Sequence, residues 1–286
     1  MLLLMACAGS TPGDSASEPL PLFDAHIHLP GQEGDELLDL AEAGGFKGLF
    51  VLGPASSASL ASAEDPVHGF VFLENNDDAE LVLTPGLLSS VRERLERGAA
   101  GIGELSIAHY GGGDPSGSAA NEADDEGLLA LYDLAGEFNA PVIAHLDYSE
   151  TTHEAWQAAL AHNRDTRFVW AHAGDTGPEV VRAHLEAHPN LQVDLSCRNP
   201  VEAFAHRPYS EEEMSIAELD RETLKPEWAA LLEDHPERFL FGSDIGPGDR
   251  NEAVEDIAAF YRRMLGQLSP EAAAAIGHDN AVALVE

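Results

Sequence analysis

The chain has few cations, and this shortage limits its partners. Lysine and arginine number 15 against 51 aspartates and glutamates, so the formal net charge is −36 at pH 7, and Lys47 and Lys225 are the only lysines. A field this negative repels nucleic acids and anionic membrane surfaces, so we expect no nucleic-acid partner. Because the acidic residues spread along the chain, we interpret them as a halophilic surface adapted to high salt. A cationic substrate or partner is the alternative.

Cysteines and long apolar runs are scarce as well. The chain has two cysteines, which cannot build a disulfide framework. No segment approaches the about 20 apolar residues that a membrane-spanning helix needs. Cys197 follows a predicted strand, and no histidine in the sequence is its obvious partner. We therefore interpret Cys197 as a buried packing residue rather than a nucleophile.

The first residues carry a pattern similar to that of exported proteins. Cys7 follows the small residue Ala6 in MLLLMACAGS, which resembles the lipobox of a bacterial lipoprotein. The next residues are rich in Ser, Gly, Pro and acids, as in a flexible tether. Residues 1–19 are thus predicted to be a signal and tether with a lipid at Cys7, the domain facing the periplasm or cell exterior. The apolar stretch is short and no Lys or Arg precedes it, so the alternative is a chance cysteine in a cytoplasmic protein.

Short runs rich in Val, Ile, Leu and Phe predict eight buried parallel strands. They lie at 22–28, 48–53, 81–85, 101–106, 141–146, 168–172, 191–195 and 239–244. Helical patterns separate most of them, at 35–43, 89–97, 126–138, 152–162 and 178–188. This alternation implies right-handed βαβ units. Eight such units in residues 20–286 predict one α/β domain with the TIM-type (β/α)8 barrel fold, which takes about 250 residues. The segment 67–73 fits either helix or strand.

Histidines and carboxylates stand at the ends of these apolar runs. They are His26, His28, Glu104, His145, His172 and Asp244. A parallel barrel builds its active site at the C-terminal ends of its strands, and imidazole and carboxylate groups are the ligands of zinc and related divalent metals. Residues two apart on a strand face the same side, so His26 and His28 can clamp one ion. Asp244 is the carboxylate expected to touch the metal and take a proton from bound water.

From DAHIHL through FGSD to the terminal DNAVALVE, the chain resembles the amidohydrolase superfamily. Residues 226–244 are similar to the amidohydrolase-related branch, which contains decarboxylases and lactonases. GIGELS resembles instead the glutamate motif of TatD-type deoxyribonucleases. The resemblance implies a metal-dependent enzyme on a (β/α)8 barrel and leaves the branch open.

Glu104 decides the expected number of ions, because binuclear members of the superfamily use a bridging carboxylate in this region. With two ions, one is held by His26, His28 and Asp244, the other by His145 and His172, and Glu104 lies between them. With one ion, the ligands are His26, His28, His145 and Asp244. His172 then polarises substrate or shuttles protons, and Glu104 supports a ligand or the substrate. We favour two ions, zinc before manganese, iron or nickel.

This chemistry predicts a hydrolase of a small molecule, in which metal-activated water attacks an ester, lactone, amide or phosphoester. Asp244 and His172 are the predicted catalytic residues. The alternatives are a TatD-like phosphodiesterase or deoxyribonuclease, a mononuclear zinc decarboxylase, and a metal-binding lipoprotein without catalysis. Nothing in the sequence indicates the oligomeric state.

Substrate contacts are expected in the loops after the strands. His109 and Tyr110 open a glycine-rich acidic loop suited to a lid. Arg198 is a candidate for holding a substrate carboxylate or phosphate, because cations are rare here and arginine suits such groups. The remaining helical histidines, among them His162, His184 and His188, are expected on solvated faces.

Overall fold

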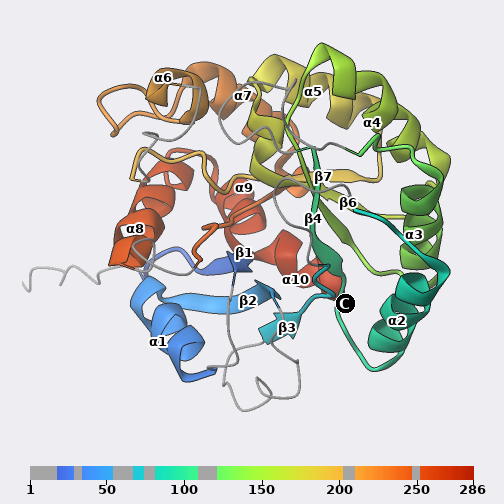
Figure 1. The fold of residues 1–286 in the computed structure, drawn as a ribbon. Helices are drawn as coiled ribbons and strands as arrows, with labels where there is room; N and C mark the ends of the chain where they lie inside the picture. The colour runs from blue at the N-terminus through green and yellow to red at the C-terminus, as the bar shows by residue number, and fades with distance from the viewer. Residues whose placement is uncertain are drawn as a thin grey trace, which may run out of the picture.

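The computed structural model describes residues 18–28, 34–53, 67–73, 81–108, 121–201, 210–246 and 252–286. Strands and helices alternate along the chain (Figure 1). The strands are β1 (Leu22–His28), β2 (Phe46–Leu52), β3 (Val67–Gly69), β4 (Ile102–Ala108), β5 (Val142–Leu146), β6 (Phe168–Trp170), β7 (Leu191–Asp194) and β8 (Phe239–Leu240). Cys7, His109 and Tyr110 lie outside the described residues.

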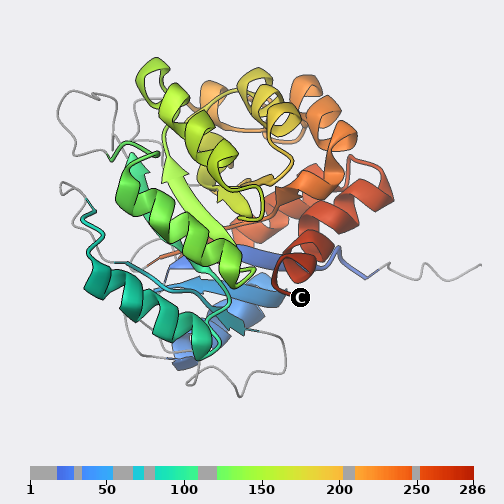
Figure 2. The same ribbon diagram turned by 90° about the vertical axis from the view of Figure 1, so that its right-hand side faces the viewer.

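Most of the helices surround the strands (Figures 1 and 2), whereas the last one, Asn280–Val285, packs against β1 and β8. The helices are α1 (Gly34–Gly44), α2 (Pro85–Glu96), α3 (Glu126–Glu137), α4 (Glu150–His162), α5 (Pro178–Ala187), α6 (Glu211–Met214), α7 (Pro226–Asp234), α8 (Val254–Leu265), α9 (Pro270–Ala274) and α10 (Asn280–Val285). In the part of the chain that the structure describes, none of them has the length and apolar character needed to cross a bilayer.

The strands close into a ring in sequence order. β1 to β3 pair in parallel, as do β4 to β8. Two isolated parallel bridges join these sheets, one between Val71 and Ile102 and the other between Ile27 and Ile245. Such closure is the architecture of a TIM-type (β/α)8 barrel. It confirms the predicted fold and brings the C-terminal ends of all the strands to one face.

The third strand was predicted in the wrong place. It lies at Val67–Gly69, within the segment that fitted either helix or strand. The apolar run at 81–84 joins neither sheet. The side chain of Asn121 pairs with Leu81 instead, accepting from its N–H at 2.9 Å and donating to its carbonyl at 3.0 Å. Pro85 then starts α2 in the first-turn position that proline favours.

β6 and β8 end earlier than predicted, and the chain then turns sharply. After Trp170, four residues in a row adopt left-handed backbone angles, from His172 (φ 55°) to Asp175 (φ 49°), within the short turn η2 (Ala171–Asp175). Each such non-glycine residue costs roughly 1–2 kcal/mol. The turn is held by Tyr148, whose N–H donates to the carbonyl of Gly174 at 2.8 Å. A Cβ at Gly174 would lie 2.0 Å from the Trp170 ring, so only glycine fits there.

Two histidines expected on solvated faces are buried. His184 on α5 is 1% exposed, and His188, the residue that ends the helix, is 4% exposed. His184 packs against Trp170 and His153 of α4, with ring centroids 4.8 and 5.1 Å apart. Burial lowers the pKa of His184, and burial together with nearby positive charge lowers the pKa of His188 to about 4. The prediction failed because the side chains of His184 on α5 and His188 at its end face inward.

The buried His188 predicts a loss of stability in mild acid. The unfolded chain protonates this histidine below its ordinary pKa of 6.5, whereas the folded chain keeps it neutral to about 4. The neutral His188 therefore contributes fully to the free energy of unfolding above pH 6.5. This contribution falls as pH decreases, by up to about 1.4 kcal/mol per pH unit. Urea unfolding at about pH 7 and about pH 5 should show a smaller acid loss for His188→Gln than for the wild type.

The exposed His162, which contacts Asp133 at 3.1 Å, provides the control. His162→Gln should lose stability in acid as the wild type does. Equal acid losses for His188→Gln and the wild type would show that His188 is not held neutral.

Candidate metal centre

The structure brings all six predicted metal-binding residues together at the C-terminal ends of the strands. His26 and His28 come from β1, Glu104 from β4 and His145 from β5. The other two follow their strands, His172 in η2 and Asp244 after β8. Donors from these separate segments meet within hydrogen-bonding distance of one another.

The first group of donors surrounds the Nε2 atoms of His26 and His28, which are 3.1 Å apart. Glu104 Oε2 lies 3.5 Å from His26 Nε2 and 3.1 Å from His28 Nε2. Asp244 Oδ1 lies 3.6 and 3.2 Å from the same two nitrogens. Nitrogen and oxygen ligands that bind one zinc ion at about 2.0–2.2 Å are about 3 to 3.5 Å from each other. The spacing therefore fits one divalent ion.

The second group faces the other oxygen of Glu104. Oε1 lies 2.9 Å from His145 Nδ1 and 3.3 Å from His172 Nε2. The two oxygens of one carboxylate are thus turned toward two different pairs of histidines. A carboxylate that bridges two metal ions requires this arrangement.

His26, His145 and His172 each use one ring nitrogen to face the other donors of the centre. The second ring nitrogen of each contacts a supporting side chain. His26 Nδ1 lies 3.0 Å from Asp194 Oδ2. His172 Nδ1 lies 2.8 Å from Ser196 Oγ, and His145 Nε2 lies 3.1 Å from Asp147 Oδ1. Such partners fix the ring orientation and the tautomer of a metal-binding histidine. The arrangement leaves the opposite nitrogen of each ring for a ligand.

The sequence pattern did not predict these partners, although Asp194 carries one signal. Asp194 is fully buried at the end of an apolar strand, and a buried carboxylate needs a partner. Its Oδ1 also accepts from the N–H groups of His172 and Ser196, each at 3.0 Å. Asp24 is another buried carboxylate in β1. Its Oδ1 accepts from the N–H groups of His26 and Ser243, and burial raises its pKa to about 7.

The histidines and carboxylates of the centre shift one another's pKa. Burial alone would raise the pKa of Glu104, but His26 and His145 hold it well below its usual range. Burial alone would lower the pKa of His28, but Asp244 and Glu104 raise it to about 9. Protons on the histidines thus balance buried carboxylates. A divalent cation would balance the same carboxylates, so the donor set fits a metal.

These shifts predict that metal binding depends on pH. Because the pKa of His28 is about 9, an ion that binds it at neutral pH must displace a proton. The apparent affinity should rise with pH, about tenfold per unit for each proton displaced, up to about pH 9. Calorimetric titration of zinc in two buffers with different ionisation enthalpies counts the released protons. An affinity that is constant from about pH 6 to about pH 9 would contradict the prediction.

Three residues of this region have left-handed backbones that are uncommon outside glycine. They are His172, Cys197 and Asp244, with φ of 55°, 58° and 55°. Residues other than glycine rarely adopt such angles, and where they do the site is often functional. Cys197 is buried as predicted, but its Sγ also lies 2.8 Å from Asp244 Oδ2. Sequence pattern alone does not reveal this contact, because it joins residues that follow two different strands.

Arg198 is fully buried beside the turn that carries His172. Its guanidinium donates to the carbonyl of Thr176 and lies 5.1 Å from the centroid of the Trp228 ring. These contacts support a structural role in holding the turn. The substrate-binding role of Arg198 stays a prediction, as do those of His109 and Tyr110.

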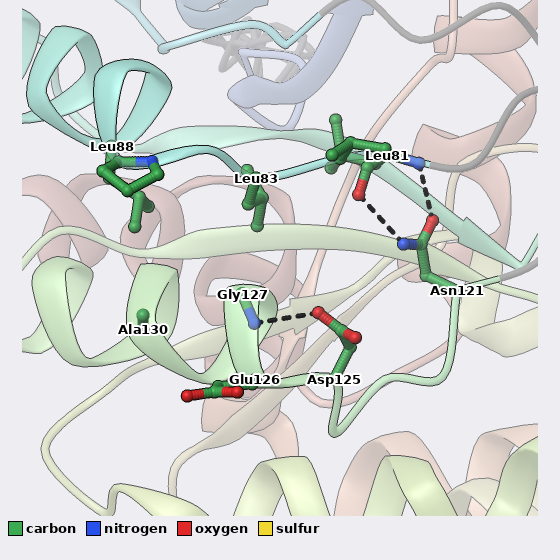
Figure 3. Close-up of a pocket in the computed structure, with 10 residues that line it drawn as sticks. Leu81, Leu83, Leu88, Asn121, Asp125, Glu126, Gly127 and Ala130 are labelled. Atoms are coloured by element: carbon green, nitrogen blue, oxygen red, sulfur yellow. Dashed lines mark hydrogen bonds between the residues drawn. The ribbon is translucent and has the colours of Figure 1, made fainter.

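A cavity of about 580 Å³ lies elsewhere, between the 81–88 segment and the start of α3. Figure 3 shows the side chain of Asn121 bonded to Leu81 on one side and that of Asp125 bonded to the N–H of Gly127 on the other. None of its lining residues is a candidate metal ligand. The cavity therefore gives no information on the chemistry of the centre.

Comparison with known families identifies the chain. The family model described as amidohydrolase matches residues 32–286. The chain belongs to the amidohydrolase family. This enzyme of the amidohydrolase superfamily carries His26 and His28 just before the matched range, and its donor groups fit the metal dependence general in that superfamily. A comparison with curated proteins gave no match.

Solved structures of distant relatives share the fold of this amidohydrolase. An uncharacterized TIM-barrel protein from Bordetella bronchiseptica is 14% identical, with a TM-score of 0.63 over 93% of this chain and 98% of the other. A dihydroorotase from Campylobacter jejuni is 14% identical, with a TM-score of 0.59 over 93% and 83%. A 2,6-dihydroxybenzoate decarboxylase from Rhizobium is 11% identical, with a TM-score of 0.56 over 92% and 98%.

Proposed function

We propose that this amidohydrolase is a binuclear metal-dependent hydrolase of a small molecule with an ester, lactone, amide or phosphoester bond. The arrangement of Glu104 carries the proposal, because its two oxygens face separate histidine pairs at 2.9 to 3.5 Å. A site for one ion does not require a carboxylate whose two oxygens face two different pairs of histidines.

The residues of the centre have distinct tasks. Metal ions held by the histidines and carboxylates would supply Lewis acidity and would make water a better nucleophile near neutral pH. Asp194 and Ser196 orient His26 and His172, and Asp147 orients His145. Their positions are fixed before substrate arrives, which lowers the cost of reaching the reactive geometry.

Asp244 is placed to move the proton. Burial alone would raise the pKa of its carboxyl, but the hydrogen bond with His28 and the interactions with His172 and His26 hold the pKa well below its usual range. Asp244 is therefore ionised. An ionised carboxylate beside the reacting water can accept its proton and return it to the leaving group.

The net charge of −36 supports a small, neutral or cationic substrate over a polynucleotide. A nuclease would need cations along the phosphate backbone, and the chain has 15 lysines and arginines in all. Oligonucleotide cleavage is therefore the less favoured outcome.

The test is hydrolysis by the full chain after removal and return of metal. The chelated protein should be inactive toward a panel of esters, lactones, amides and phosphoesters, and zinc or manganese should restore turnover of one class. His162→Gln, on the exposed end of α4, is a control that should behave as the wild type. Metal binding without turnover of any class would contradict the proposal and favour a binding protein.

Decarboxylation is the second candidate, suggested by the fold shared with the Rhizobium decarboxylase. The same metal-restored samples should be offered 2,6-dihydroxybenzoate. Release of CO₂ without hydrolysis in the panel would replace the first proposal with the second.

A further inference from the structure

The wall of the metal centre between His172 and Asp244 contains a sulfur atom. The Sγ of Cys197, a ring nitrogen of His172 and a carboxylate oxygen of Asp244 all lie within 4.8 Å of one another. All three residues are buried, with exposures of 1%, 2% and 5%. They follow three successive strands, β6, β7 and β8, whose ends are adjacent in the barrel. The thiol is therefore among the candidate ligands rather than in the apolar core.

The backbone after β7 fixes the direction of this thiol. Cys197 has a φ of 58°, in the left-handed region. The preceding N–H, of Ser196, donates to Asp194 Oδ1 at 3.0 Å, and the following N–H, of Arg198, donates to the carbonyl of Leu195 at 3.1 Å. Arg198 is itself anchored by its guanidinium on Thr176. The strained residue is thus held from both sides, as happens where a side chain has to be aimed.

Asp244 contacts both a histidine of the centre and the thiol of Cys197. Its Oδ1 lies 3.2 Å from His28 Nε2, whereas its Oδ2 lies 2.8 Å from Cys197 Sγ. His172 is likewise a member of the group with Cys197 and of the group with His26 and Glu104. Cys197 therefore adjoins two residues that already belong to the candidate centre.

We propose that Cys197 is a sulfur ligand of the metal centre and makes it selective for thiophilic divalent ions. The inference rests on the proposed function in that it requires the centre to bind metal. Thiolate ligands favour zinc, cobalt and cadmium, whereas a site built from carboxylate and water suits magnesium and manganese. The ligand is the thiolate, so metal binding releases the thiol proton to solvent.

Cobalt substitution of the full chain tests the proposal, with cobalt per chain measured in every sample. A thiolate bound to Co²⁺ gives an intense charge-transfer absorption in the near ultraviolet, which nitrogen and oxygen ligands do not. The band should be present in the wild type and absent from Cys197→Ser, which keeps a hydroxyl donor for Asp244. Cys7→Ser, the only other cysteine substitution the chain offers, is the matched control and should keep the band.

Metal competition gives a second readout in the same variants. The preference for zinc over manganese should fall at least about tenfold in Cys197→Ser and stay unchanged in Cys7→Ser. The wild type alone also answers the question through cadmium-113 NMR, so the test does not depend on the folding of a variant. A resonance in the range of sulfur-bound cadmium is expected.

The outcomes separate this inference from the proposed function. Bound cobalt without the charge-transfer band, or a band that persists in Cys197→Ser, would overturn sulfur ligation and leave the hydrolase proposal standing. In that case the thiol serves only as a hydrogen-bond donor to Asp244. A wild-type chain that binds neither cobalt nor cadmium would overturn both.

Discussion

Asp244→Asn is expected to reduce kcat by roughly 10²- to 10⁴-fold, the range that a positioned acid–base group contributes. Asparagine keeps an oxygen at the position of Oδ1, 3.2 Å from His28 Nε2, but it cannot accept the proton of the attacking water. Binding of metal should persist, because His26, His28 and Glu104 remain. The measurement is kcat on whichever substrate class the hydrolysis panel identifies, with metal per chain determined on the same preparation.

The matched control is Asp234→Asn at the end of α7. Asp234 is 59% exposed and pairs with Arg182 at 2.8 Å, so its loss removes a surface ion pair and leaves the centre intact. Its kcat should equal that of the wild type. If Asp244→Asn kept more than about a tenth of the wild-type kcat with metal bound, Asp244 would not be the proton acceptor.

Glu104→Ala should have the largest effect on metal content, from two ions per chain to one or none. The carboxylate contributes an oxygen to each histidine pair, with contacts of 3.1 Å to His28 and 2.9 Å to His145. Its removal also lowers the pKa of His26 and His145, which reduces proton competition, so a loss of metal would reflect the missing carboxylate oxygens and charge. Metal per chain is measured by mass spectrometry after dialysis against zinc.

The Glu104→Gln variant tests whether metal binding needs the negative charge of Glu104 or only a side chain of the same shape. The amide keeps one oxygen, so it should retain the ion on one side better than the ion on the other. Glu137→Ala on α3 is the control, since Glu137 is 56% exposed and pairs only with Arg92 among the contacts described. Two tightly bound ions in Glu104→Ala would show that Glu104 does not bridge.

The order of the barrel strands could be predicted from sequence because a parallel strand buried on both faces is a short apolar run. The same rule failed at 81–84, an apolar run that joins no strand and whose first residue, Leu81, pairs with the side chain of Asn121. Periodicity cannot show where the backbone finds its hydrogen bonds. The true third strand, Val67–Gly69, is three residues long and contains His68, so its apolar signal is weak.

The candidate ligands could be predicted for a related reason. His26, Glu104, His145 and Asp244 each end or follow an apolar run, and the barrel topology brings those ends together. Their supporting residues could not be predicted as readily. The contact of Asp194 with His26 joins β7 to β1, and that of Cys197 with Asp244 joins the residues after β7 and β8. Both pairs are distant in sequence. The lipid anchor at Cys7 stays a prediction.

The location of the metal ions tests the central claim most directly. Crystals of the full chain grown with zinc should show two peaks in an anomalous difference map collected above the zinc edge. One peak should lie beside His26, His28 and Asp244, the other beside His145 and His172, with the carboxylate of Glu104 between them. A single peak would contradict the bridged centre, and the absence of any peak beside these residues would contradict the metal-dependent hydrolase itself.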